Sequence, residues 1–253
     1  KIMVASDIHG SALYCRKMLD AFEREQADRL LLLGDLLYHG PRNDLPAGYA
    51  PKEVIPLLNA QKNWLLCVRG NCDTEVDQMV LEFPIMAESC ILWLGSRMVF
   101  ATHGHHFNTA SLPPLQPGDI LLHGHTHVPA WEPFSLSPAC TAPASNCPSP
   151  AASECLYLNP GSVSIPKENS PRGYMILTDH AAEWKTLEGE GIIGIPSYLL
   201  VQRLNQKADR PKSIVTGNHD GLFIFHPSLI DIFPAMGGVI TNGDMLSHAL
   251  SHS

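Results

Sequence analysis

Short, fully apolar segments limit the fold of this chain more than any other feature of its sequence. Residues 2–5, 30–33 and 64–68 form such segments, and each is followed within a few residues by a glycine and by an acidic or amide side chain. Runs of this length without polar alternation are typical of parallel strands, which are buried on both faces. Residues 11–26 have apolar side chains at near-helical spacing. The start of the chain therefore predicts a strand, a helix and a parallel strand.

The remaining elements complete an α/β fold. A helix is expected after Pro51, with Pro56 kinking or shortening it. Residues 91–94 and 97–102 flank Gly95-Ser96, a pair that a two-residue hairpin turn accepts. Further strands are expected at residues 120–122, 157–158 and 173–178, the last two closing a second sheet. We expect two packed β-sheets flanked by helices.

Two regions depart from this pattern. Residues 133–155 are rich in Pro, Ala and Ser without periodicity, and they predict a surface loop insertion. Residues 189–253 mix short apolar runs with Gly, Pro and His, and they predict an irregular C-terminal extension of uncertain order. The domain is therefore expected to span residues 1–188.

The composition limits the classes of function that fit this chain. The formal net charge is -8 and the pI is about 5.9. This balance argues against stable binding to nucleic acid or to an anionic membrane, both of which require a basic surface. No run approaches a membrane span or a signal peptide, and the seven cysteines form no secreted-type framework. We expect a cytoplasmic protein with a small soluble substrate; homo-oligomerisation stays open.

Potential metal ligands follow most of the predicted strands. The carboxyl ends of parallel strands meet at one crevice, so side chains placed there converge. Asp7 and His9 are two residues apart, and extended backbone would point both the same way. The seven side chains expected to converge are Asp7, His9, Asp35, Asn71, His103, His125 and His127.

The chemistry of this set predicts a two-metal hydrolase. Nitrogen and oxygen ligands together suit borderline divalent cations such as manganese, iron, cobalt or zinc. Two cations about 3.5–4 Å apart would bind the oxygens of a phosphate and hold a bridging water as hydroxide for in-line attack. A phosphate ester needs such help because the attack meets an anion.

The same residues resemble a known family. Asp-x-His, Gly-Asp, Gly-Asn-x-Asp, His-Gly-His and Gly-His-Thr-His occur in this order, as in the calcineurin-like metallophosphoesterases. Residues 39–43, 68–73 and 159–166 look more closely like the YfcE-type bacterial phosphodiesterases. The resemblance covers roughly residues 1–188 and implies the four-layer sandwich of that superfamily.

The resemblance also implies roles for individual residues. One cation would be held by Asp7, His9, Asp35 and His127, and the other by Asp35, Asn71, His103 and His125, so that Asp35 bridges them. The cofactors implied are two divalent metal ions, with Mn²⁺ preferred and Zn²⁺, Fe²⁺, Co²⁺ or Ni²⁺ as alternatives. Asp35 and Asn71 would thereby take part in catalysis.

The residues for proton transfer and for substrate binding are less determined. The superfamily usually has histidine after Gly-Asn, credited with protonating the leaving group, whereas this chain has Cys72. A thiol is a weak donor, so His105 is the better candidate for the general acid. Arg42 and Asn43 are expected to contact the phosphate, because a guanidinium fork suits its oxygens. Alternatively, Arg42 pairs with a carboxylate such as Asp44, and Asn43 only shapes a turn.

The prediction is a metal-dependent phosphodiesterase that acts on a small phosphodiester or nucleotide-like compound. A phosphomonoesterase acting on small phosphorylated metabolites is the first alternative. A non-catalytic scaffold on the same fold is the second alternative. Relatives of that kind have lost residues at the metal positions, whereas this chain keeps them. Residues 217–220 spell a second Gly-Asn-His-Asp, which we interpret as chance because the partner motifs are missing around it.

Overall fold

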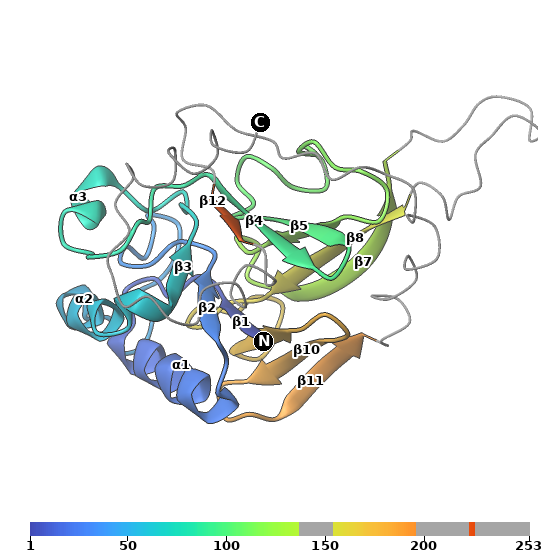
Figure 1. The fold of residues 1–253 in the computed structure, drawn as a ribbon. Helices are drawn as coiled ribbons and strands as arrows, with labels where there is room; N and C mark the ends of the chain where they lie inside the picture. Colours follow the sequence, from blue (N-terminus) through green and yellow to red (C-terminus); the bar gives the residue numbers. More distant parts are fainter. Residues whose placement is uncertain (137–153, 196–222, 226–253) are drawn as a thin grey trace, which may run out of the picture.

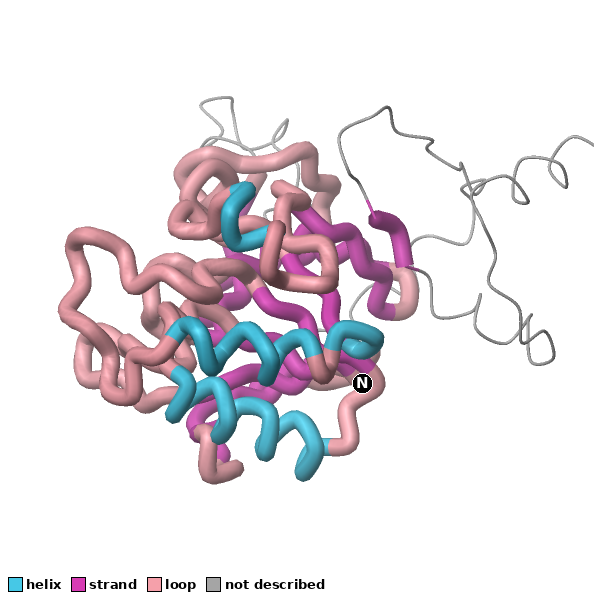
Figure 2. Tube along the Cα trace, turned by 90° about the vertical axis from the view of Figure 1, so that its left-hand side faces the viewer, coloured by secondary structure: helices cyan, strands magenta, loops and turns pink. Residues whose placement is uncertain are grey.

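The computed structural model describes residues 1–136, 154–195 and 223–225. Two six-stranded mixed sheets pack face to face (Figure 1). Helices lie on the outer face of the first sheet, in front of its strands in Figure 2. The predicted α/β architecture of two packed sheets flanked by helices is confirmed. The second Gly-Asn-His-Asp motif lies outside the described residues.

The first sheet has the order β11-β10-β9-β1-β2-β3. Its first three strands along the chain are mutually parallel: β1 (Ile2–Ala5), β2 (Arg29–Leu32) and β3 (Leu65–Cys67). The remaining three are added in antiparallel fashion: β9 (Gly173–Leu177), β10 (Ala182–Thr186) and β11 (Gly191–Ile195). The βαβ units predicted from the apolar runs are thus present.

Helices connect these parallel strands. α1 (Ala12–Glu25) begins at Ser11, whose hydroxyl accepts a hydrogen bond from the backbone N–H of Tyr14. α2 (Pro51–Asn59) continues through Pro56, and a 3₁₀ turn (Lys62–Trp64) and the short α3 (Glu75–Gln78) flank β3. Among the described residues, no helix has the length and apolarity to cross a bilayer.

The second sheet has the order β12-β4-β5-β6-β8-β7. β4 (Ser89–Leu94) and β5 (Arg97–Thr102) form the predicted hairpin, with Leu94 opposite Arg97 and Gly95 at φ +57°. Parallel pairing joins β5 to β6 (Ile120–His123) and β6 to β8 (Glu154–Pro160). The edges are β7 (Pro129–Ser135) and β12 (Phe223–Phe225).

Alternation along the central strands divides the core into layers. Leu30 and Leu32 pack under the helices, whereas Leu31 and Leu33 pack between the sheets with Leu122. On the outer face of the second sheet, the cover within the described residues includes loop residues such as Phe107 and Leu115. The parallel strands are therefore buried on both sides, and their carboxyl ends are held rigidly.

Three expectations about boundaries need correction or extension. Residues 173–178 were expected in the second sheet, but β9 pairs with β1 in the first. β11 belongs to the first sheet, so regular structure continues past residue 188. β7 and β8 enter the segment 133–155 from its two ends, and residues 137–153 lie outside the described part. The missed signal is strand pairing, which depends on contacts between distant parts of the chain.

Candidate metal centre

All seven predicted ligands lie at one point, where the carboxyl ends of strands from both sheets meet. Asp7 and His9 follow β1, Asp35 follows β2, and Asn71 follows β3. His103 directly follows β5, and His125 and His127 come after β6. The convergence inferred from strand ends is what the structure has, although the role of each residue as a metal ligand stays a prediction.

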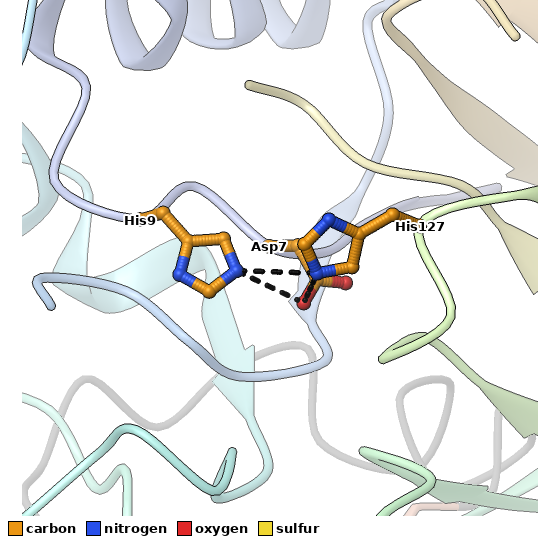
Figure 3. Close-up of side chains that lie close together, drawn as sticks. All are labelled: Asp7, His9 and His127. Atoms are coloured by element: carbon orange, nitrogen blue, oxygen red, sulfur yellow. Dashed lines mark hydrogen bonds and ion pairs between the residues drawn. The ribbon is translucent and has the colours of Figure 1, made fainter. Parts of the chain in front are cut away.

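The first group consists of Asp7, His9 and His127 (Figure 3). The Oδ1 atom of Asp7 lies 3.2 Å from Nε2 of His127 and 3.5 Å from Nε2 of His9. The two imidazole Nε2 atoms are 3.3 Å apart. The three side chains are at most 3% exposed. Three potential ligand atoms thus face one another in a nearly dry pocket.

The second group gathers around His103, and Asp35 lies between the two groups. Nε2 of His103 is 3.0 Å from Oδ1 of Asn71 and 3.1 Å from Nδ1 of His125. Oδ2 of Asp35 is 3.5 Å from Nε2 of His103 and 3.7 Å from Nε2 of His9. Its other oxygen, Oδ1, accepts a hydrogen bond from the backbone N–H of Cys72. One carboxylate oxygen of Asp35 therefore faces both groups.

Hydrogen bonding assigns the protons of three imidazoles. Nδ1 of His9, His103 and His127 lies 2.8, 2.6 and 2.6 Å from the carbonyl oxygens of Tyr38, Leu33 and Ile165. A carbonyl only accepts, so each Nδ1 carries the proton and each Nε2 of a neutral ring presents a lone pair.

The lone pairs then face other acceptors, which is unfavourable without a cation. Nε2 of His9 faces Nε2 of His127, and Nε2 of His103 faces the amide oxygen of Asn71. Oδ1 of Asp7 is buried and has no hydrogen-bond partner in the described part of the chain. A metal-bound imidazole also usually donates a hydrogen bond from its other ring nitrogen to a carbonyl or a carboxylate. These residues fit divalent cations.

Backbone strain is concentrated at the same place. Asp7, His9, Asp35, His125 and His127 all have positive φ, between 48° and 67°. This left-handed region is uncommon for residues other than glycine and is found mainly at functional sites. The expectation that extended backbone aligns Asp7 and His9 is wrong. The two side chains converge because the chain leaves β1 in a tight left-handed path.

Buried polar groups support this path. Both oxygens of Asp73 accept backbone N–H groups: Oδ2 those of Asp35 and Gly70, and Oδ1 that of Leu36, each at 2.8 Å. Gly70 itself permits a close approach, because a Cβ there would lie 2.1 Å from Oδ1 of Asp35. Asp73 thereby fixes the loop that carries Asp35 against the loop that carries Asn71.

Two further supports hold Asp7 and the His125–His127 loop. The hydroxyls of Ser162 and Ser164 donate to the backbone carbonyl of Asp7 at 3.0 and 3.1 Å. The amide nitrogen of Asn159 donates to Gly124 O and to Thr126 Oγ1. The segment 159–164 therefore supports the site from behind.

The electrostatics favour an ionised Asp7. Burial by itself raises the pKa of Asp7, but the neighbouring imidazoles of His127, His9 and His103 outweigh burial and hold it well below the usual range. Burial lowers the pKa of His9, but Asp7 outweighs it and raises that pKa, so a proton competes with a cation at this ring. The pKa of His125 is lowered, first by burial and then by His103. A carboxylate and a neutral imidazole are the forms that bind cations.

The predicted substrate and acid residues lie around the centre. Arg42 and Asn43 line a cleft of about 460 Å³ that opens over Asp35, Asn71 and His127. Asn43 donates from its amide to His39 O at 2.9 Å, as the alternative of a turn residue predicts. Arg42 forms no ion pair within the described residues, and so the alternative pair with Asp44 is not found.

The ring centroids of His105 and His103 are 5.4 Å apart. Burial, followed by the charges of His103 and His106, lowers its pKa to about 4. A histidine with this pKa is neutral near pH 7, which weakens its case as a proton donor. Cys72 is buried beside Asn71, and burial raises the pKa of its thiol. The general acid stays a prediction.

Sequence reasoning missed Lys167. Lys167 lines the cleft from the loop between β8 and β9. It directly follows the segment 159–166 that resembles the phosphodiesterases, so its position was the available signal. The three backbone contacts of the buried Asp73 were also beyond the sequence. Nothing in the sequence shows which backbone groups a carboxylate will reach.

Comparison with known families agrees with the fold. The profile of the calcineurin-like phosphoesterase superfamily domain matches residues 1–181. The chain belongs to the calcineurin-like phosphoesterase superfamily, and as a member it is a hydrolase that acts on phosphoric ester bonds. The family implies divalent metal ions, in agreement with the donor set described above.

The particular relatives are bacterial. The chain is 42% identical over 193 residues to phosphodiesterase YfcE of Escherichia coli strain K12, covering 76% of this chain and 95% of that protein. The protein of the same name from Escherichia coli O157:H7 matches equally. The solved structure of YfcE, described as a phosphoesterase from E. coli, matches with a TM-score of 0.66 and 40% identity, over 78% of this chain and 98% of that one.

Proposed function

We propose that this protein is a metal-dependent phosphodiesterase that cleaves a small phosphodiester. The observation that carries the proposal is the set of potential ligand atoms that face one another, above all Nε2 of His9 and Nε2 of His127 at 3.3 Å beside the buried Oδ1 of Asp7. The relatives named phosphodiesterase support the choice of a diester. The intact ligand set argues against a scaffold without catalysis.

The ligand sets follow the two groups in the structure. Asp7, His9, Asp35 and His127 would hold one cation, and Asp35, Asn71, His103 and His125 the other. Oδ2 of Asp35 faces both groups, so it is the atom proposed to be shared. Two divalent cations here would neutralise phosphate oxygens and lower the pKa of a water for in-line attack on phosphorus. Nitrogen and oxygen ligands suit borderline divalent cations. Mn²⁺ is the proposed metal because the family resemblance implies it, with Zn²⁺, Fe²⁺, Co²⁺ and Ni²⁺ as alternatives.

The remaining residues either hold the proposed ligands in position or contact the substrate. The carbonyls of Tyr38, Leu33 and Ile165 keep the three imidazoles in the ligand tautomer. Arg42 is exposed at the cleft and is available for a phosphate oxygen. His105 is the proposed proton donor for a poor leaving group because its ring lies beside that of His103, and its lowered pKa restricts this role to acidic pH. Asn43 holds the loop of Arg42 through His39.

Turnover of matched chromogenic esters tests the proposal. Protein stripped of metal and reloaded with Mn²⁺, Zn²⁺, Fe²⁺, Co²⁺ or Ni²⁺ is assayed on bis(p-nitrophenyl) phosphate and on p-nitrophenyl phosphate. We expect metal-dependent cleavage, with the diester preferred. Preference for the monoester would favour a phosphomonoesterase, and absence of turnover with every metal would reject the function. Bound metal per chain, measured by elemental analysis, should approach two and fall in Asp7→Ala.

A further inference from the structure

Two positively charged side chains from separate loops lie at the mouth of the cleft. Arg42 lies between β2 and α2, and Lys167 lies between β8 and β9. Neither forms an ion pair or a side-chain hydrogen bond with another residue of the described ranges 1–136, 154–195 and 223–225. Several exposed cationic side chains elsewhere are paired with acids, as in Arg16 with Glu53 at 2.6 Å and Lys17 with Glu188 at 2.9 Å. The cleft of an otherwise acidic protein therefore has unpaired positive charge at its mouth.

The backbone of Lys167 is fixed to the site. Its N–H donates to the carbonyl of His127 at 3.3 Å. The backbone N–H of Ser170 donates to Lys167 O at 3.0 Å. The hydroxyl of Ser170 lies within hydrogen-bond distance of both Lys167 O and His127 O. The two residues inside this turn, Glu168 and Asn169, have φ of 53° and 56°. A strained turn tied to a proposed ligand indicates a position that is held for function.

The lining of the cleft is polar. Within the described residues it contains no Phe, Tyr or Trp, and its aromatic rings are the imidazoles of the proposed ligands His125 and His127. The scissile phosphate of a diester has a single negative charge, which the proposed metal ions at Asp35 and the side chain of Arg42 would meet. The side chain of Lys167 is therefore available for a second negative charge on the substrate.

We infer that the cleft selects phosphodiesters in which the arm retained after cleavage has a second anionic group, a carboxylate or a phosphate, bound by Lys167. Lys167 is then a specificity-determining residue. This inference rests on the proposed phosphodiesterase function. It narrows the substrate from any small diester to one with an anionic arm.

Four diesters with one leaving group test the inference. Each is a p-nitrophenyl phosphate diester, and the retained arm is ethyl, choline, carboxymethyl or 2-phosphoethyl. We expect kcat/KM for the two anionic arms to exceed that for ethyl by about tenfold, and choline to be poorest. A preference for only one anionic arm identifies which group is bound. Equal rates for ethyl and both anionic arms would overturn the inference while leaving the phosphodiesterase in place.

Variants assign the selectivity to Lys167. In Lys167→Gln, the ratio of kcat/KM between anionic and ethyl arms should fall about fivefold, and Lys167→Arg should restore most of it. Lys52→Gln, an exposed lysine on α2 outside the cleft, makes the same charge change and should leave the ratio as it is. The ratio should also fall as salt is raised. If Lys167→Gln lowers all four rates by one factor, Lys167 acts on the scissile phosphate and the inference is wrong.

Discussion

The floor of the cleft and its rim are built in opposite ways. The floor consists of Asp7, His9, Asp35, His103 and His127, which are at most 3% exposed and are held by backbone carbonyls or amides. The rim consists of Arg42 and Lys167, which are exposed and have no charged partner among the described residues. Buried polar groups must be satisfied, and so the floor permits few arrangements. The difference assigns chemistry to the floor and selectivity to the rim.

The largest effect is expected from the residue shared by both groups. In Asp35→Asn, kcat/KM on bis(p-nitrophenyl) phosphate should fall about 10³-fold or more, because a neutral amide replaces the central anionic ligand. Steady-state assays with Mn²⁺ and elemental analysis measure the change. Asp20→Asn, on the exposed face of α1, should behave as wild type. Activity of Asp35→Asn within tenfold of wild type would show that the floor does not carry the chemistry.

A smaller loss is expected from a residue that supports the floor without facing the phosphate. Asp73→Asn places a donor against one of three backbone N–H groups now accepted by the carboxylate. Activity should fall about 10–100-fold, and the free energy of unfolding should fall by about 1–3 kcal/mol. Kinetics and urea denaturation measure the two effects. Glu75→Gln is the exposed control in the same segment. A stability loss without a change in activity would separate Asp73 from the site.

At the rim the effect should be modest and of a different kind. Arg42→Gln should raise KM for bis(p-nitrophenyl) phosphate about 2–10-fold with little change in kcat, because an exposed side chain binds ground state and transition state alike. Arg16→Gln, an exposed arginine on α1, is the matched control. A loss confined to kcat would place Arg42 with the floor and break the distinction.

The smallest effect on activity is expected far from the cleft. Burial by itself raises the pKa of Glu25, but hydrogen bonds from Lys185, Lys1 and Tyr174 outweigh it and lower the pKa to about 2 from 4.5. The ionised form therefore stabilises the fold above pH 4.5, and this contribution is lost as the pH falls towards 2.

Glu25→Gln should accordingly lower the free energy of unfolding at pH 7, and the difference from wild type should shrink between about pH 4.5 and pH 2. Denaturation at a series of pH values measures it, with Glu23→Gln as the exposed control. Turnover at pH 7 should not change. A difference that is independent of pH would contradict the proposed role of the charge.

Much of this arrangement could be predicted from the sequence. The apolar runs before Asp7, Asp35 and Asn71 indicated buried strands, and the rule that parallel strands end at one crevice brought the ligands together. The hairpin at Gly95-Ser96 was confirmed because a two-residue turn is determined locally. What could be predicted had a short-range cause or followed from a general rule of topology.

The sequence by itself determined the first six strands along the chain, the order of the ligand motifs and the kind of chemistry, because burial patterns and ligand types are local properties. Only the tertiary structure decided that β9 lies beside β1, that Asp73 holds the loops of Asp35 and Gly70 together, and that the turn after Lys167 is tied to His127. Each of these depends on contacts between residues far apart in the chain. Such contacts are settled by packing and by the need to satisfy buried hydrogen-bonding groups, and neither can be read from a single segment.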